Sequence, residues 1–166
     1  MDDAEFRNVM EGAGFMESGP TDDPHARATG YLSNFILACI KDDLEQQRDV
    51  YNEIIDATMG DNEVAYQAVE LFSESTINKA RIVAAVVIKY RLLQAPTMET
   101  WDMYRQTLMM LTEDYDPNVA LKAAQARQQW RKAALETATS SADREQILVA
   151  GTLQTPSFLP DWVQTR

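Results

Sequence analysis

The chain has 166 residues, of which 45% are hydrophobic and 25% charged, with one cysteine and a formal net charge of −11 at pH 7. This length and composition predict one folded globular domain and exclude an intrinsically disordered chain. A single cysteine excludes an internal disulfide and a cysteine-based zinc site. The negative charge argues against direct contact with nucleic acid or an anionic membrane.

The first 27 residues are predicted to form an acidic arm. Residues 1–24 contain seven acidic side chains and one basic residue, Arg7, and glycines and prolines interrupt the segment after residue 11. Residues 2–11 have an apolar spacing compatible with a short helix. The arm lacks the basic and apolar regions of a secretory signal. We expect it to contact other proteins through Asp2, Asp3, Glu5 and Phe6.

Three helices are predicted in the first half of the chain after this arm. Apolar residues recur at helical spacing from Ala28 to Met59, which predicts one long amphipathic helix that ends at Gly60. Asp61 or Asn62 can cap a second helix, which a cluster of serine, glutamate and threonine at residues 73–76 interrupts.

The third of these helices is predicted over residues 77–94. Its centre, residues 82–88, is apolar on all sides, as in a helix that other elements cover. The β-branched residues in this run leave a buried strand as the alternative. The run is the longest apolar stretch of the chain and is too short to cross a bilayer.

The second half of the chain is predicted to contain three more helices and an apolar tail. Thr97 follows the helix breaker Pro96 and can cap a helix, and Asp116 followed by Pro117 marks the start of another that extends to about residue 138. Ser140 or Ser141 can cap a short last helix that ends at residue 151. The tail after it is extended, and we expect it to bind another subunit through Phe158, Leu159 and Trp162.

These elements predict an all-α, single-domain bundle of five or six helices. The acidic N-terminal arm covers residues 1–27, the helical domain residues 28–151, and the extended apolar C-terminal arm residues 152–166. No repeat or low-complexity linker divides the pattern.

Few residues offer catalytic or metal-binding chemistry. His25 is the only histidine and is expected in an exposed loop, because no helical Glu-x-x-His pattern surrounds it. Cys39 lies in an apolar run and is expected to be a buried thiol. A group of carboxylates is expected on the solvated face of the long helix: Asp42, Asp43, Glu45, Glu53 and Asp56. No nucleophile elbow or phosphate-binding glycine loop occurs, so we expect a protein that is not an enzyme and has no cofactor or metal.

Two segments are locally basic in this acidic chain. One contains Lys79, Arg81, Lys89 and Arg91, and the other, residues 118–135, contains Lys122, Arg127, Arg131 and Lys132. The four cations of residues 118–135 do not share one helix face, which favours packing or protein contact over nucleic-acid recognition. The acidic arm, the basic helices and the apolar tail can satisfy one another within one chain or between neighbouring chains.

The sequence therefore favours a structural or assembly subunit of a larger complex, such as a virus or phage particle, whose terminal arms hold neighbouring subunits. We expect the partners to be other protein subunits, in a homo-oligomer or larger assembly, and the location to be a virion or the cytoplasm. The alternative is an acidic regulatory module that binds and blocks a basic protein surface, as a nucleic-acid mimic does.

Overall fold

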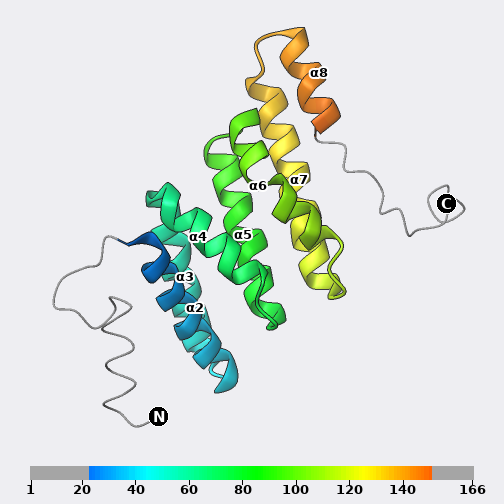
Figure 1. The fold of residues 1–166 in the computed structure, drawn as a ribbon. Coiled ribbons are helices and arrows are strands. Elements are labelled where there is room, and N and C mark those ends of the chain that lie inside the picture. Colours follow the sequence, from blue (N-terminus) through cyan, green and yellow to red (C-terminus); the bar gives the residue numbers. More distant parts are fainter. Residues whose placement is uncertain (1–22, 151–166) are drawn as a thin grey trace, which may run out of the picture. The chain divides into compact units, whose positions relative to one another are not determined.

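A computed structural model of the chain describes residues 23–150, which form seven α-helices with no β-strand in that range (Figure 1). The all-α prediction is confirmed, whereas the prediction of five or six helices is wrong. Several predictions for the two arms lie outside the described residues: the helix over residues 2–11, the contacts of Asp2, Asp3, Glu5 and Phe6, the helix end at Gly151, and the contacts of Phe158, Leu159 and Trp162. Residues 24–27, which the predicted N-terminal arm included, belong to the first described helix. No helix of the described part is long and apolar enough to span a membrane.

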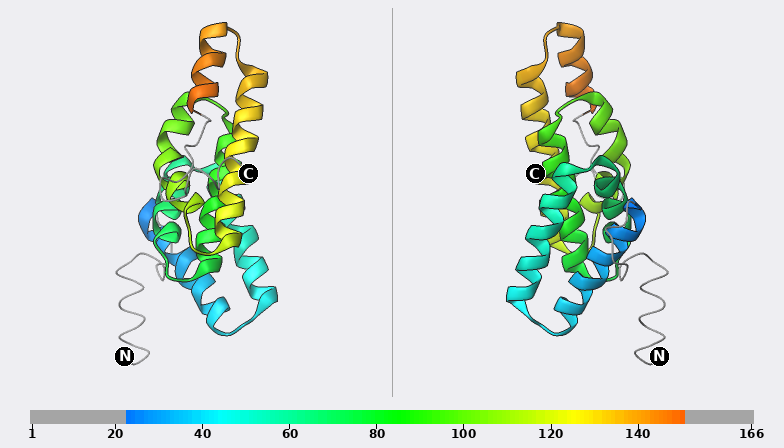
Figure 2. Two further views of the ribbon diagram at one scale, coloured as in Figure 1. Left: turned by 90° about the vertical axis from the view of Figure 1, so that its right-hand side faces the viewer. Right: turned by 90° about the vertical axis from the view of Figure 1, so that its left-hand side faces the viewer.

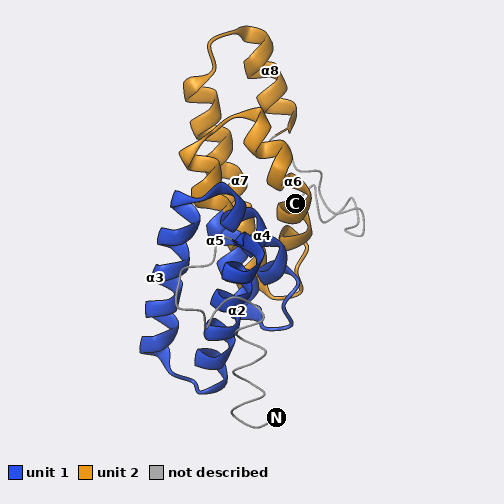
Figure 3. Cartoon of the chain, turned by 60° about the vertical axis from the view of Figure 1, so that its left-hand side comes forward, with its two compact units in different colours: residues 1–87 blue, residues 88–166 orange. Residues whose placement is uncertain are grey.

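The chain divides into two compact units, residues 1–87 and residues 88–166 (Figure 3). The division falls inside one helix, α5 (Asn78–Gln94). The two units are therefore joined within a continuous helix.

The first unit contains α2 (Pro24–Ile40), α3 (Leu44–Gly60), α4 (Asn62–Ser73) and the first part of α5. α2 packs against both α3 and α4, and α3 also packs against α4 (Figure 1). Phe35 of α2 and Phe72 of α4 are buried, with ring centroids 6.2 Å apart and the planes tilted by 49°. Tilted aromatic pairs at this separation are favourable beyond the area that they bury.

The helix predicted from Ala28 to Met59 is two helices joined by a turn at residues 41–43. Asp42 has a positive φ of 54°, and the backbone N–H of Asp43 bonds to the carbonyl of Ala38 at 3.0 Å while that of Asp42 bonds to Cys39 at 3.1 Å. This is the Schellman ending of a helix, in which glycine usually takes the left-handed position. Aspartate occupies this position here, so no glycine marks the end of α2 in the sequence.

Asp43 begins α3 by accepting a hydrogen bond from the backbone N–H of Gln46 at 3.0 Å. We expect Asp43→Ala to lower the free energy of unfolding by about 1 kcal/mol, because it removes an N-cap. Asp43→Asn is the matched control, since asparagine caps helices equally well. Chemical denaturation measures both variants, and equal stability of Asp43→Ala and Asp43→Asn would show that the cap is not needed.

The other predicted helix starts are confirmed by their caps. Asp61 accepts from the backbone N–H groups of Glu63 and Val64 at the start of α4, and its carboxylate also lies 3.5 Å from Arg27. Thr97 caps α6 (Met98–Thr112), and Asp116 followed by Pro117 opens α7 (Pro117–Thr137). Aspartate and threonine are common N-caps because their side-chain oxygens accept from otherwise unpaired N–H groups.

The segment over residues 82–88 is helical, so the helix was the correct choice over a strand. Every residue from Val83 to Ile88 is buried, and Ile82 is partly exposed. Arg81 is buried as well, and its guanidinium donates to the carbonyl of Ser75 at 2.9 Å and to Asn78 Oδ1 at 2.6 Å. These bonds hold the turn before α5 and satisfy a charge that would otherwise be costly to bury.

The second unit contains the rest of α5 with α6, α7 and α8 (Ser141–Ala150). α6 packs on α7 through two buried indoles, because Trp101 and Trp130 stack with centroids 4.3 Å apart and planes 16° from parallel. α7 and α8 form a helical hairpin (Figure 2). Within α8, Ile147 is the buried residue, while Val149 is 71% exposed.

Candidate functional site

An apolar groove lies on the first unit, between α2, α3 and the start of α5. Its volume is about 310 Å³. The lining side chains are mostly apolar, with two cations among them: Phe35, Leu44, Gln47, Arg48, Tyr51, Lys79, Ile82 and Val83. A concave, mainly apolar site with a few polar groups is typical of a surface that binds a side chain or a small ligand. We call it the α3 groove.

A buried glutamine holds one wall of the α3 groove. The amide Nε2 of Gln47 donates to the backbone carbonyl of Ala38 at 3.2 Å, and its Oε1 accepts from Lys79 Nζ at 2.9 Å. Gln47 is 7% exposed, so these bonds satisfy an amide that would be expensive to bury unpaired. They also fix the Lys79 ammonium at the edge of the groove, where two of its three N–H groups remain for other acceptors.

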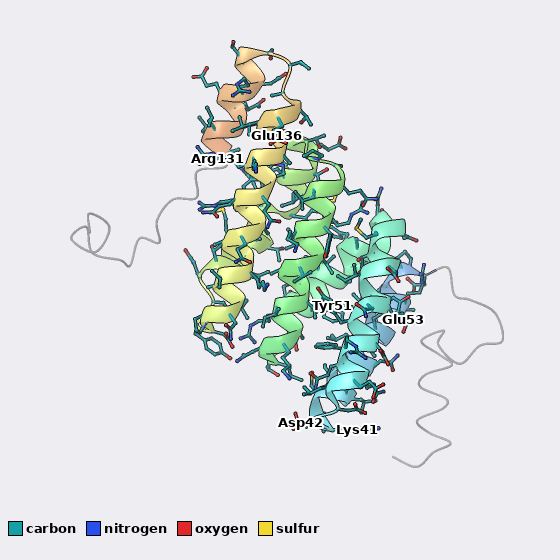
Figure 4. All side chains as sticks on the ribbon, turned by 180° about the vertical axis from the view of Figure 1, so that it is seen from behind. Lys41, Asp42, Tyr51, Glu53, Arg131 and Glu136 are labelled. Atoms are coloured by element: carbon teal, nitrogen blue, oxygen red, sulfur yellow. The ribbon has the colours of Figure 1, made fainter. Side chains whose placement is uncertain are left out.

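The second cation, Arg48, lies on α3 next to the groove. Its Nε is 4.0 Å from the Asp49 carboxylate, and both side chains are 68% exposed, so this ion pair is weak. The guanidinium can therefore turn to another carboxylate at little cost. On the opposite side of α3, Glu53 points away from Tyr51, as the labels in Figure 4 show.

The carboxylates predicted on the solvated side of the long helix are exposed, as expected. The structure adds Asp49 to them, and Glu45, Asp49, Glu53 and Asp56 follow the i, i+4, i+8, i+11 spacing of one helix face. We call this set, with Asp42 and Asp43 before the helix, the acidic face of α3. Among the described residues, no group of three or more histidine, cysteine or acidic side chains has the arrangement of a metal site.

His25 lies in the first turn of α2 and not in a loop, so that part of the prediction is wrong. The reason is that α2 begins before His25. Asp23 caps the helix by accepting a hydrogen bond from the backbone N–H of His25 at 3.0 Å, and Pro24 occupies the first helical position. The imidazole is exposed, as predicted, and its Nδ1 lies 3.1 Å from Gln67 Oε1. This contact ties α2 to α4 at the surface.

Cys39 is partly exposed rather than buried as predicted, because it stands in the last turn of α2, one residue before the exposed Ile40. Partial burial raises the pKa of its thiol above the ordinary value, and the nearby Lys79 ammonium lowers it by a smaller amount. The net effect keeps the thiol protonated at neutral pH, which disfavours nucleophilic chemistry.

The basic segment at residues 118–135 belongs to α7, and its cations lie on more than one side of the helix, as predicted. Arg127 and Arg131 are one turn apart and half-buried, whereas Lys122 and Lys132 are exposed. Burial lowers the pKa of Arg127, and the positive charge of Arg131 lowers it further. Neither arginine forms an ion pair with a carboxylate of residues 23–150. Figure 4 labels Arg131 on α7, with Glu136 further along the helix.

The residues of the α3 groove were not predicted from the sequence. Leu44 is one of the apolar residues whose spacing predicts one long helix from Ala28 to Met59, yet it is 67% exposed at the start of α3. Gln47 is a polar residue on the apolar side of this helical pattern, four residues before the apolar position Tyr51, and such a residue is a signal from which the groove could have been predicted.

Searches of protein-family models, curated proteins and solved structures found no match to this chain.

Proposed function

We propose that this chain is a non-enzymatic assembly subunit of a larger complex, such as a virion, and that copies of it associate head to tail. The supporting observation is an uneven distribution of charge between the two units. Residues 1–87 contain 17 acidic and six basic side chains, whereas residues 88–166 contain nine of each. The whole net charge of −11 therefore belongs to the first unit.

The second unit offers two cations one helical turn apart, Arg127 and Arg131 of α7. α7 has four basic side chains against one acidic residue, Glu136. Arg127 and Arg131 repel each other and lack a carboxylate partner in the described part of the chain, so an acidic surface placed against them relieves an unfavourable arrangement. The acidic face of α3 on a second copy has the required charge.

Two different surfaces that complement each other produce a heterologous contact. Such contacts repeat from copy to copy and give a closed ring or an open filament. Charge complementarity also speeds association and rejects wrong partners. This behaviour suits a subunit that is present in many copies.

Sedimentation velocity of the full-length chain over a range of concentrations tests the proposal. We expect oligomers at about 0.05 M NaCl that dissociate at about 0.5 M, because the Debye length falls from about 14 Å to about 4 Å. Arg127→Glu with Arg131→Glu should weaken association by about tenfold or more. Lys89→Glu with Arg105→Glu makes the same charge change elsewhere in the second unit and is the matched control.

A chain that stays monomeric at high concentration and low salt would contradict the proposal. The acidic face of α3 then favours the second candidate function, an acidic regulatory module that covers a basic protein surface. Six exposed carboxylates, four on α3 and two directly before it, resemble the charge spacing of a polyanion. In that case a cationic probe such as polylysine should bind the monomer, and Glu53→Gln with Asp56→Asn should weaken the complex.

A further inference from the structure

We infer that the α3 groove binds the C-terminal segment of a neighbouring copy, residues 158–163, with Trp162 or Phe158 in the hollow and Asp161 against Arg48 and Lys79. The inference rests on the proposed assembly function, because the occupant is a second copy. It adds a second contact between copies, made by the α3 groove and residues 158–163, to the charge-driven contact between α3 and α7.

The groove selects for an apolar side chain next to a carboxylate. Its floor is formed by aromatic and aliphatic residues of α2, α3 and α5, among them Phe35, Ile82 and Val83, and its volume of about 310 Å³ suits one or two large side chains. Two of the five basic side chains in residues 23–87, Arg48 and Lys79, stand in its lining. A carboxylate that reaches them makes charge-assisted hydrogen bonds.

The C-terminal segment has this pattern. Phe158, Leu159 and Trp162 provide large apolar side chains, and Asp161 is directly next to Trp162 in the sequence. Pro156 and Pro160 restrict the chain and reduce the entropy that is lost when it binds. Helix α8 ends at Ala150, which leaves 16 residues beyond it, long enough for the segment to extend to another subunit.

The N-terminal segment fits the groove less well, although Phe6 is also flanked by acidic residues. Residues 1–22 carry six acidic side chains and one basic one, and residues 23–87, which form the groove, carry 11 acidic and five basic side chains and repel them. Residues 151–166 contain Asp161 and Arg166 as their charged side chains and are neutral overall. The C-terminal segment can therefore approach α3 without this repulsion.

The test compares full-length variants by sedimentation velocity. Leu44→Asp places a carboxylate at the groove entrance, where Leu44 is 67% exposed, and aspartate suits the first turn of α3. We expect it to weaken association by about tenfold or more, and Trp162→Ala to do the same. Ile40→Asp, at a residue that is 71% exposed and outside the groove lining, and Gln164→Ala are the matched controls and should change association less than about twofold.

A charge exchange then tests the pairing itself. Arg48→Glu and Asp161→Arg should each weaken association, and the double variant should recover most of the loss, which a general effect on folding would not do.

Each other outcome overturns the inference in a distinguishable way. If Leu44→Asp and Ile40→Asp behave alike while Arg127→Glu with Arg131→Glu still dissociates the oligomer, the groove is not the contact but the assembly function stands. If Asp2→Asn with Glu5→Gln, and not Trp162→Ala, removes the dependence on Leu44, the N-terminal segment is the occupant. If the wild-type chain is monomeric, both the inference and the proposed function fail.

Discussion

Replacing Val86 by aspartate is expected to prevent the chain from folding. Val86 is 6% exposed in the centre of α5, and its neighbours from Val83 to Ile88 are buried with it. A carboxylate at this position loses its hydration without gaining a partner, which costs several kcal/mol, a large part of the stability of a typical domain. Circular dichroism and thermal denaturation should show no cooperative unfolding transition.

Leu93→Asp is the control for this prediction. It introduces the same side chain into the same helix at a residue that is 37% exposed, so the carboxylate keeps much of its water and the transition should survive. A Val86→Asp protein with the melting temperature of the wild type would mean that this side of α5 is in contact with solvent.

Truncating Trp130 to alanine should destabilise the chain by about 3–5 kcal/mol, the usual cost of removing a large aromatic side chain from a core. Trp130 is fully buried and stacks on Trp101 at 4.3 Å, so the substitution leaves a cavity and also removes the aromatic contact between α6 and α7. Urea denaturation gives the change in the free energy of unfolding directly.

Two further variants separate the contributions of the indole. Trp130→Phe keeps an aromatic ring and removes an indole N–H that has no hydrogen-bond partner among the described residues, so it should cost clearly less than Trp130→Ala. Leu121→Ala, at a site on α7 that is 56% exposed, should change stability by less than about 0.5 kcal/mol. Equal effects of Trp130→Ala and Leu121→Ala would contradict the buried stack.

The helix ends that the sequence predicted correctly are those marked by residues with a strong local preference. Asp116 with Pro117, and Thr97 after Pro96, act through their own side chains and need no knowledge of the tertiary structure. The burial of the centre of α5 was predictable for a different reason. A helix that is apolar on all sides has to be covered by other elements.

The end of α2 was not predictable, because it depends on a left-handed aspartate. Lys41, Asp42 and Asp43 are polar residues of the kind found on the exposed side of a helix. The apolar residues on either side of them, Ile40 and Leu44, keep the helical spacing, so nothing in the pattern marks a break. The left-handed conformation is less favourable for aspartate than the helical one by about 1–2 kcal/mol, so the packing of α3 back onto α2 has to offset this cost. A single long helix over these residues would have no α3 groove, because the groove forms only where α2 and α3 lie side by side. The groove was therefore not predictable from the apolar spacing either.

The position of α5 has a consequence for dividing the gene. The boundary between residues 87 and 88 would leave ten residues of this helix on one fragment and seven on the other. Helical segments of that length are barely stable alone, and both segments carry apolar side chains that are buried in the intact chain, such as Val83 and Ile88. Neither half is therefore a transferable module, and recombination or fusion at this point should produce insoluble fragments, whereas breaks outside residues 78–94 would spare the shared helix.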